Sequence, residues 1–422
     1  MVKVEIIQGF NEIGGNCIRI EDNDTTIMFD QGIRFSLFRR YYSRIFSPRG
    51  IPELRDLRII PPLESYNGIS VLYITHFHLD HLGLLQAVPD RISIKIPSRE
   101  SMELIEKWYE KSTSWLAYVP PKYTARIEEV SILKSDKNNV MAIPVRHSSY
   151  PALAYIYFGS NETVLYTGDF RIDPILSKEQ DEIMYTTTLL DYLNDNPDIK
   201  IDTLIIEGTN FGRVNTPISG EVAQRILNKI VNPNATALEI IGYHDIEIAL
   251  MNILILKNLG KQIIITSNRL LEQLELWNYK LGLDLNLGDL FTLPTTIETA
   301  TIFSIIDEMD VIKEPQKYAI ITDLHNLEDT LSIFRNQKPP GGSLALLLLS
   351  EPIDESSVQE EKTVINWLQY YGFLPYRLRI SGHYYPHQLK KIIEVIKPRR
   401  IKPIHTTRAP LLHKVYEDTR PG

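Results

Sequence analysis

Four potential metal ligands lie within six residues of this 422-residue chain, in the sequence Thr75-His-Phe-His-Leu-Asp-His81. They directly follow the apolar residues 71–74, which are typical of a buried strand, so the polar side chains gather where that strand ends. Burying so many polar groups without partners would be costly. Zinc proteases of the helical type instead place two histidines four residues apart on one helix face. We interpret the segment as a metal-binding loop, with a hydrogen-bonded turn as the alternative. Alternate residues point in two directions from this loop, so His76 and His78 can serve one ion while Asp80 and His81 serve a neighbouring one.

The composition limits which residues can hold a metal and how the chain can bind other molecules. Cys17 is the only cysteine, which excludes an internal disulfide and cysteine-rich zinc sites and fits a reducing compartment. The chain has 45 Lys and Arg against 53 Asp and Glu, and its net charge of -8 argues against binding nucleic acid through overall charge. Any metal must therefore sit on histidines and carboxylates, and a nucleic acid would need a local basic groove.

The pattern of apolar residues predicts an α/β protein of two or three domains. Up to about Tyr166 the chain shows short strand-like runs with turn signals. From about Leu204, apolar runs alternate with helix-period segments, which predicts βα units around a parallel sheet. The N-terminus lacks the apolar run of a secretory signal, and the longest apolar run, residues 344–349, is far short of the about 20 residues that cross a bilayer. We expect a cytoplasmic protein with no membrane partner.

Three further candidate ligands each follow a predicted strand: His147 after residues 141–145, Asp169 after 164–166, and His405 after 401–404. Taken singly, each is at least as readily explained as a structural residue, such as a hydrogen-bonded core histidine or an aspartate in a turn. Two ions need about eight ligand positions, some shared or filled by solvent. Because all three residues end strands, as the first cluster does, we expect them to converge at one sheet edge around a pair of ions.

The order of these residues resembles that of a known superfamily. Asp30 in Met-Phe-Asp-Gln-Gly, the cluster at 76–81, His147 and Asp169 look like the four successive motifs of the metallo-β-lactamase superfamily. Glu207 in Ile-Ile-Glu-Gly-Thr, His383 in Ser-Gly-His and His405 in Pro-Ile-His resemble the three additional motifs of the β-CASP nucleases. The spacing of the last two is most similar to ribonuclease J, and the short stretch after His405 looks like the archaeal type.

This resemblance implies a fold and a ligand set. The fold would be a metallo-β-lactamase αββα sandwich, built from residues 1–211 and 372–422, with an inserted α/β β-CASP domain at 212–371. Two zinc ions would be bound, one by His76, His78 and His147 and the other by Asp80, His81 and His405, with Asp169 bridging. Asp30 would orient a ligand histidine from behind. Manganese fits many of the same positions.

The resemblance also implies which residues act on a substrate, with Asp80, Glu207 and His383 as the catalytic group. Glu207 would pair with a late histidine, and His383 would face the scissile phosphate as a general acid or as a donor to its oxygens. Ser381, Gly382 and His383 would hold a terminal phosphate. The alternatives are a surface carboxylate for Glu207 and a cap of the following helix for His383. Tyr384-Tyr385 and Thr406-Thr407 depart from the ribonuclease J pattern at the border of this phosphate pocket, which affects end preference more than hydrolysis.

The expected function is that of a zinc-dependent ribonuclease hydrolysing phosphodiester bonds of single-stranded RNA, acting 5′ to 3′ as an exonuclease with preference for a 5′-monophosphate end. Three alternatives stay open: a β-CASP endonuclease for RNA processing or DNA, a metallohydrolase of small esters or thioesters, and an inactive RNA-binding module. A homodimer and RNA-processing or ribosome-associated partners also fit the resemblance.

Two basic stretches are candidates for contacting RNA phosphates. One holds the arginines from Arg34 to Arg49, and the other comprises Lys390, Lys391, Arg399, Arg400 and Lys402. The aromatic residues Phe35, Phe38, Tyr41 and Tyr42 interleave with the first stretch and could stack on bases, as in single-strand binders. A solvated charged face is the alternative for both.

Overall fold

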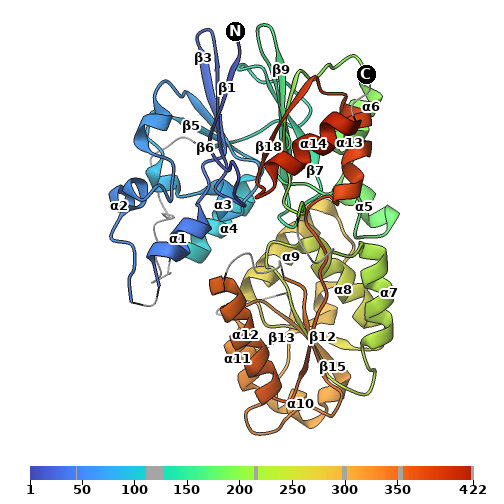
Figure 1. Cartoon of the computed structure of the whole chain (residues 1–422). Helices are drawn as coiled ribbons and strands as arrows, with labels where there is room; N and C mark the ends of the chain where they lie inside the picture. The colour runs from blue at the N-terminus through green and yellow to red at the C-terminus, as the bar shows by residue number, and fades with distance from the viewer. Residues whose placement is uncertain (44, 111–126, 213–216, 297–301, 350–354, 420–422) are drawn as a thin grey trace. The chain divides into compact units, whose positions relative to one another are not determined.

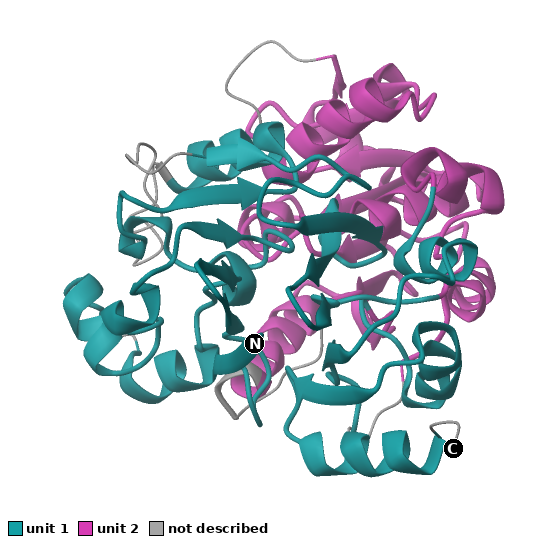
Figure 2. Ribbon diagram, turned by 90° about the horizontal axis from the view of Figure 1, so that it is seen from above, with its two compact units in different colours: residues 1–172, 187–216, 382–422 teal, residues 173–186, 217–381 magenta. Residues whose placement is uncertain are grey.

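The computed structural model of the chain describes residues 1–43, 45–110, 127–212, 217–296, 302–349 and 355–419. The chain forms two compact units, which have different colours in Figure 2. The first unit comprises residues 1–172, 187–216 and 382–422, and the second comprises residues 173–186 and 217–381. The first unit is therefore built from three separate stretches of the sequence, and the second unit is inserted between them along the chain.

The first unit contains two sheets (Figure 1). The six-stranded sheet has the order β1 (Lys3–Gln8), β2 (Cys17–Asp22), β3 (Thr25–Phe29), β4 (Val71–Tyr73), β5 (Ser93–Ile96) and β6 (Ile127–Glu129). The five-stranded sheet has the order β18 (Arg400–Ile404), β10 (Thr203–Glu207), β9 (Thr163–Tyr166), β8 (Ala152–Phe158) and β7 (Val140–Val145). Its helices are α1 (Phe35–Tyr41), α2 (Ile51–Asp56), α3 (Leu79–Leu82), α4 (Arg99–Glu110), α6 (Leu189–Asp195), α13 (Leu389–Ile396) and α14 (Ala409–Thr419).

The alternation of side chains along β8 shows how the layers of the first unit form. Leu153, Tyr155 and Tyr157 belong to a core shared with residues of β2, β3 and β4, which lies between the two sheets. Ala152, Ala154 and Ile156 belong to a second core shared with α6, α13 and α14. Because successive side chains of a strand point to opposite faces, a strand that is apolar throughout is buried on both sides. The result is two packed sheets with helices outside them, as the sequence predicts.

The second unit is built around a seven-stranded sheet in which every pairing is parallel. Its order is β14 (Ser304–Ile305), β13 (Leu290–Thr292), β12 (Gln262–Ile265), β15 (Tyr318–Thr322), β11 (Ala237–Ile240), β16 (Leu344–Leu347) and β17 (Leu374–Arg377). Its helices are α5 (Lys178–Met184), α7 (Gly220–Ile230), α8 (Ile246–Asn258), α9 (Asn268–Leu281), α10 (Glu308–Lys313), α11 (Leu327–Ser332) and α12 (Glu355–Tyr370). The predicted βα units around a parallel sheet are therefore confirmed.

The two largest differences between these units and the expected segments 1–211, 212–371 and 372–422 lie at residues 173–186 and 372–381. Residues 173–186 pack in the second unit, where the hydroxyl of Tyr185 donates to Glu247 at 2.7 Å. Residues 372–381 also lie there, because β17 pairs with β16 and completes the parallel sheet. A strand pattern does not tell which sheet a strand joins, so these boundaries depend on pairing that the sequence does not reveal.

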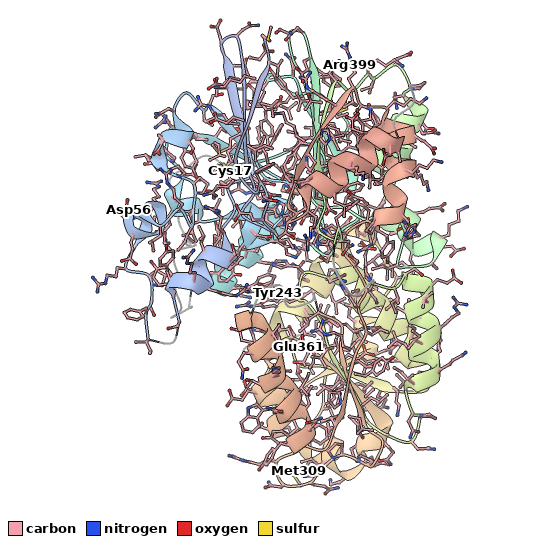
Figure 3. All side chains as sticks on the ribbon, in the orientation of Figure 1. Cys17, Asp56, Tyr243, Met309, Glu361 and Arg399 are labelled. Carbon is pink, nitrogen blue, oxygen red and sulfur yellow. The ribbon has the colours of Figure 1, made fainter. Side chains whose placement is uncertain are left out.

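Cys17, which is labelled in Figure 3, lies fully buried in β2. Burial raises the pKa of its thiol, so it acts as a small core residue, in agreement with the sequence analysis. Among the described residues, none of the helices has the length and apolar character that crossing a membrane requires.

Glu239 in the central strand β11 provides a test of the second unit. Its side chain is buried, and Oε2 has no hydrogen-bond partner among the described residues. Burial raises the pKa of this carboxyl from 4.5 to about 8. The Glu239 carboxyl of the folded protein then stays protonated at pH values at which the unfolded chain has already released this proton. The contribution of this group to the free energy of unfolding is therefore fully present below the pKa of the unfolded chain, and it is lost as the pH rises toward about 8.

We expect the free energy of unfolding, measured by urea denaturation, to fall by up to about 1.4 kcal/mol per pH unit in that window through this one group. Glu239→Gln should remove this part of the slope and stabilise the protein at pH 8. Glu275→Gln, at an exposed position of α9, is the matched control and should leave the slope intact. An unchanged slope in Glu239→Gln would contradict the assignment.

Candidate metal centre

Polar residues that are distant in sequence meet at the ends of strands in the first unit. His76 follows β4, His147 follows β7, Asp169 follows β9, Glu207 ends β10, and His405 follows β18. β10 is parallel to both β9 and β18, so their carboxyl ends lie at the same edge. β7 and β9 are both antiparallel to β8 and so share one direction. The topology thus collects at one edge the residues that the sequence predicts to converge.

His76, His78 and His147 form the first group of potential ligands, with one nitrogen of each ring within 4.8 Å of the others. Nε2 of His147 lies 3.2 Å from Nδ1 of His78. On the other side of the ring, Nδ1 of His147 lies 2.8 Å from the carbonyl oxygen of Gly382. A carbonyl can only accept, so His147 carries its proton on Nδ1 and turns the lone pair of Nε2 toward the group.

The ring of His76 is oriented in a similar way through a threonine. The Thr75 hydroxyl donates its proton to Oδ2 of Asp30 at 2.9 Å. It therefore accepts from Nδ1 of His76, which lies 3.0 Å away. The lone pair of His76 is then on Nε2. Hydrogen bonds behind both rings thus set which nitrogen is available to a cation.

Asp80, His81 and His405 form the second group, and Asp169 contacts both groups. Oδ2 of Asp169 lies 3.2 Å from Nε2 of His81, 3.5 Å from Nε2 of His405 and 3.9 Å from Nε2 of His147. Nε2 of His405 is also 3.1 Å from Oδ2 of Asp80. One carboxylate oxygen therefore faces histidines of both groups, which is the arrangement that a bridging ligand needs.

Asp30 lies behind the ligands, with a backbone φ of 55° that is unusual for a residue other than glycine. Its carboxylate accepts hydrogen bonds from the Thr75 backbone N–H at 2.8 Å, the Tyr166 hydroxyl at 2.6 Å and Nδ1 of His81 at 2.8 Å. The bond from His81 leaves Nε2 of that ring facing Asp169. Asp30 thus contacts two candidate ligands from behind, His81 directly and His76 through Thr75.

The short helix α3, which carries Asp80 and His81, is held by its backbone carbonyls. Three of them accept from backbone N–H groups: Leu79 from Ile33 at 3.0 Å, Asp80 from Asn16 at 3.0 Å, and His81 from Gln31 at 2.9 Å. At Gly32, a Cβ atom would lie 1.7 Å from the carbonyl oxygen of Asp80, so only glycine allows the strand-end loop to approach so closely. Two loops distant in sequence therefore fix this helix.

His383 and Glu207 form a pair beside Asp169. Nδ1 of His383 lies 3.2 Å from Oε1 of Glu207 and 3.9 Å from Oδ2 of Asp169. Glu207 is fully buried, whereas the His383 side chain is 18% exposed. The imidazole thus has one nitrogen against a buried carboxylate and a partly exposed ring, which suits proton transfer to a bound molecule.

Tyr384 was expected at the border of the phosphate pocket, but the structure places its side chain in the core. The ring packs against Phe170 and Phe211, with centroid distances of 5.2 and 6.1 Å. Its hydroxyl donates to the backbone carbonyl of Glu207 at 2.8 Å. The large side chain therefore anchors the loop next to the end of β10, which accounts for its departure from the family pattern.

Thr209 connects the Glu207 pair to the second ligand group. Its backbone N–H donates to Oε2 of Glu207 at 2.8 Å. Its hydroxyl lies 2.8 Å from Nδ1 of His405 and donates to the carbonyl oxygen of the same residue at 3.4 Å. The hydroxyl therefore accepts from Nδ1 and leaves Nε2 facing Asp80 and Asp169. His405 has a φ of 50° and donates its N–H to the Gly9 carbonyl at 2.8 Å.

Replacing Thr209 by valine should test this orientation, because valine keeps the shape and removes the hydroxyl. We expect the weaker of the two metal-binding steps to lose affinity by about 10- to 100-fold, as measured by calorimetric titration of the metal-free protein. Thr209→Ser keeps the hydroxyl and should bind metal like the parent. Equal metal affinity in the valine variant and the parent would show that the contact does not position His405.

The protonation of the first group favours a cation. Burial, together with the neighbouring imidazoles, holds the pKa of His76 and His147 well below the usual value. Burial also lowers the pKa of His78 to about 4. All three rings are therefore neutral near pH 7 and can offer lone pairs without first losing a proton.

The second group instead shares protons between carboxylates and histidines. Burial opposes ionisation of Asp169 and Asp80, but His405 and His81 hold the pKa of both carboxyls below the usual value. Burial likewise opposes protonation of His81 and His405, yet the nearby carboxylates raise the pKa of both rings. A cation bound here would replace the protons, so binding should release them.

Three buried atoms of the cluster have no hydrogen-bond partner within the part of the chain that the structure describes: Nε2 of His76, Nε2 of His81 and Oδ1 of Asp169. Of these, Nε2 of His81 faces Oδ2 of Asp169 at 3.2 Å. Such atoms are costly unless something else pairs with them. A divalent cation is a partner that both an imidazole nitrogen and a carboxylate oxygen can bind, and this donor set suits zinc or manganese. The residues therefore fit a metal.

The structure brings together all seven sequence-predicted ligands, together with Asp30, Glu207, Gly382 and His383. Ser381 is a buried residue of the second unit, and its role in phosphate binding stays a prediction. The sequence analysis missed Thr75, Tyr166 and Thr209. Thr75 and Thr209 lie within two residues of a predicted site residue at a strand end, which is the signal that could have identified them. Arg44, one of the arginines predicted to contact RNA, lies outside the residues that the structure describes.

Several curated proteins are similar to parts of the chain. It is 22% identical over 177 residues to Ribonuclease J of Pyrococcus abyssi, covering 41% of this chain and 39% of that protein. It is 25% identical over 228 residues to Cleavage and polyadenylation specificity factor 73 of Drosophila melanogaster, covering 50% of this chain and 29% of that protein. It is 21% identical over 250 residues to Transcription termination factor FttA of Methanocaldococcus jannaschii, covering 55% of this chain and 35% of that protein. The matches thus span less than two fifths of each of these relatives.

A solved structure matches nearly the whole chain. It is a protein of unknown function from Enterococcus faecalis V583, with a TM-score of 0.72, 17% identity and coverage of 97% of this chain and 95% of that one. This likeness shows the fold alone. No protein-family model matches the chain. The resemblance predicted from the motifs is confirmed by these relatives, and the predicted fold class by the matching structure.

Proposed function

We propose that the chain is a metal-dependent hydrolase that cleaves phosphodiester bonds of single-stranded RNA. The observation that carries the proposal is the position of Asp169, whose Oδ2 lies within 3.9 Å of both potential ligand groups and of His383. A metal centre and a candidate proton donor thus share one carboxylate. The names of two relatives, ribonuclease J and cleavage and polyadenylation specificity factor 73, support RNA as the substrate.

In the proposed mechanism the chain's own residues hold the centre and move a proton. When bound, a pair of divalent ions lowers the pKa of a water molecule and neutralises phosphate oxygens. His76, His78 and His147 would hold one ion, and Asp80, His81 and His405 the other, with Asp169 between them. Thr75, Gly382 and Thr209 keep the ring nitrogens in the orientation that this requires.

His383 would donate a proton to the leaving oxygen. Its Nδ1 faces Glu207, so Nε2 is the nitrogen left for the substrate. The buried Glu207 carboxylate would hold the Nδ1 proton and stabilise the charged ring until the transfer. Because Thr209 and Tyr384 both donate hydrogen bonds to Glu207, the fold fixes the position of Glu207, and through it that of His383, relative to the metal centre.

The finer parts of the proposal rest on the resemblance to ribonuclease J. Two zinc ions are the preferred cofactor, with manganese as the alternative. The 5′ to 3′ direction and a preference for a 5′-monophosphate follow from Ser381, Gly382 and His383 as a phosphate pocket. A cytoplasmic location, a homodimer and RNA-processing partners also stay predictions.

Digestion of body-labelled single-stranded RNA with zinc or manganese tests the proposal, using the same RNA with a 5′-monophosphate or a 5′-triphosphate. We expect mononucleotides from the first reaction, released faster from the monophosphate end. Discrete internal fragments from both RNAs would favour an endonuclease, which the name of the Drosophila relative supports as a second candidate. Hydrolysis of a thioester but of no nucleic acid would contradict the proposal.

A further inference from the structure

We propose that residues of α1 and of the loop at 45–49, outside the metal ligands of the first unit, bind single-stranded RNA. This basic-aromatic surface comprises Arg39, Arg40, Tyr41, Phe46 and Arg49. The inference rests on the proposed function, since it takes RNA as the substrate, and it adds a place where nucleotides away from the scissile bond are held.

The charge of the segment opposes that of the whole protein. No Asp or Glu occurs between Asp30 and Glu53, whereas the chain as a whole has a net charge of -8. Arg34 at the start of the stretch is used within the fold, because its Nε lies 2.9 Å from Oε2 of Glu12. Arg40 and Arg49 are exposed, and Arg39 is half-buried. A polyanion is the ligand whose charge complements such a patch in an acidic protein.

Several apolar residues of the segment lie outside the core. Helix α1 has no buried residue, although most helices in proteins are stabilised by packing an apolar face. Tyr41 is 45% exposed, and Phe46, in the following loop, is 66% exposed. Exposed apolar side chains that gather in one place mark interaction sites more often than isolated ones do. A ligand with flat apolar faces would cover them.

The rings and guanidinium groups of the segment already lie against each other. The guanidinium of Arg39 lies 5.7 Å from the ring centroid of Phe35, and that of Arg40 lies 5.9 Å from the ring of Tyr41. Nucleobases stack on aromatic rings and on guanidinium planes, while arginines pair with the phosphates between them. The base of the surface is anchored, because the buried Tyr42 donates its hydroxyl proton to Glu53.

Single-stranded RNA fits this surface better than a lipid membrane, the other partner that basic and aromatic residues attract. Helices that lie in a membrane interface bury a continuous apolar face and keep their basic residues on the opposite face. On α1 the two kinds of residue are not separated, because Arg39 lies against the ring of Phe35 and Arg40 against that of Tyr41. Binding to vesicles of anionic phospholipid is therefore included as an outcome that would overturn the inference.

The test measures binding of fluorescent single-stranded RNA of about 16 and about 4 nucleotides by anisotropy over a range of salt concentrations. All proteins are full chains with Asp169→Asn, which we expect to slow hydrolysis by at least about 10³-fold. Arg39→Gln with Arg40→Gln should weaken binding of the longer RNA about tenfold and make the slope of log K against log salt shallower by about 1.4. Tyr41→Ser with Phe46→Ser should weaken it at least about fivefold without changing the slope.

Binding of the shorter RNA, which we expect to occupy the metal cluster first, should change much less in either variant. Arg225→Gln with Lys229→Gln, at exposed positions of α7, removes the same charge elsewhere and should bind both RNAs like the parent. Three outcomes would each overturn the inference. They are an equal loss of RNA binding in this control, unchanged binding of the longer RNA in the surface variants, and binding to anionic vesicles in place of RNA.

The outcome is separable from that of the proposed function. Hydrolysis of RNA by the protein with Asp169 intact, together with surface variants that bind like the parent, would remove the surface and leave the nuclease. Surface-dependent RNA binding without any hydrolysis would support the surface and remove the nuclease.

Discussion

Replacing Asp169 by asparagine is expected to lower kcat/KM for single-stranded RNA by at least about 10³-fold and to reduce the metal content of the protein. Its Oδ2 lies 3.2 Å from His81, 3.5 Å from His405 and 3.9 Å from His147, so this one oxygen contacts both ligand groups. Asparagine keeps the size but removes the negative charge that offsets two cations. Steady-state kinetics and elemental analysis of the dialysed protein measure the two effects.

The control for this variant is Asp56→Asn, which makes the same chemical change at an exposed position of α2 (Figure 3). It should keep full activity and full metal content. Circular dichroism of Asp169→Asn should match that of the parent, since the substitution is isosteric. If Asp169→Asn retained both turnover and metal, the carboxylate could not be the ligand shared by the two groups.

Replacing His383 by alanine is expected to lower kcat by about 10² to 10⁴-fold while leaving the metal content unchanged. The ring faces the buried Glu207 carboxylate through Nδ1, and its side chain is 18% exposed. Its loss removes the proton donor and no metal ligand. An aryl phosphodiester, whose leaving group needs no proton, should therefore be hydrolysed almost as fast by the variant as by the parent.

His413→Ala, at an exposed position of α14, is the matched control and should behave like the parent with both substrates. His383 has a second candidate role as a metal ligand, because Asp169, Glu207 and His383 also lie close enough together to hold an ion. Loss of metal from His383→Ala, with equal losses of activity on RNA and on the aryl diester, would make His383 a ligand and not the acid.

Much of the metal centre could be predicted because its residues follow strands. The cluster at 76–81 is contiguous, and its density alone indicates a metal. His147, Asp169 and His405 carry no local signal of comparable strength. They become predictable because parallel strands end at one edge of a sheet, a rule that places side chains without any knowledge of the loops between them. The alternation of apolar runs with helical segments likewise predicted the parallel sheet of the second unit, whose central strands β11, β12, β15 and β16 are largely buried.

The rest depends on contacts that only the folded chain makes. Thr75, Thr209 and the carbonyl of Gly382 fix the histidine tautomers, but a hydroxyl or carbonyl near a histidine in sequence does not indicate which nitrogen it meets. Tyr384 reads as a residue near the phosphate pocket until its contacts with Phe170 and Phe211 show it to be core. Glu239 is a carboxylate within a strand, and nothing in the sequence reveals that its Oε2 has no hydrogen-bond partner among the described residues.

Anomalous X-ray scattering from crystals of the zinc-loaded protein tests the central claim most directly. Two peaks are expected in the first unit, one about 2.0–2.1 Å from nitrogens of His76, His78 and His147 and the other bound by Asp80, His81 and His405. Density for Asp169 should contact both. An absence of zinc at these histidines, with the metal elsewhere or not retained, would contradict the account.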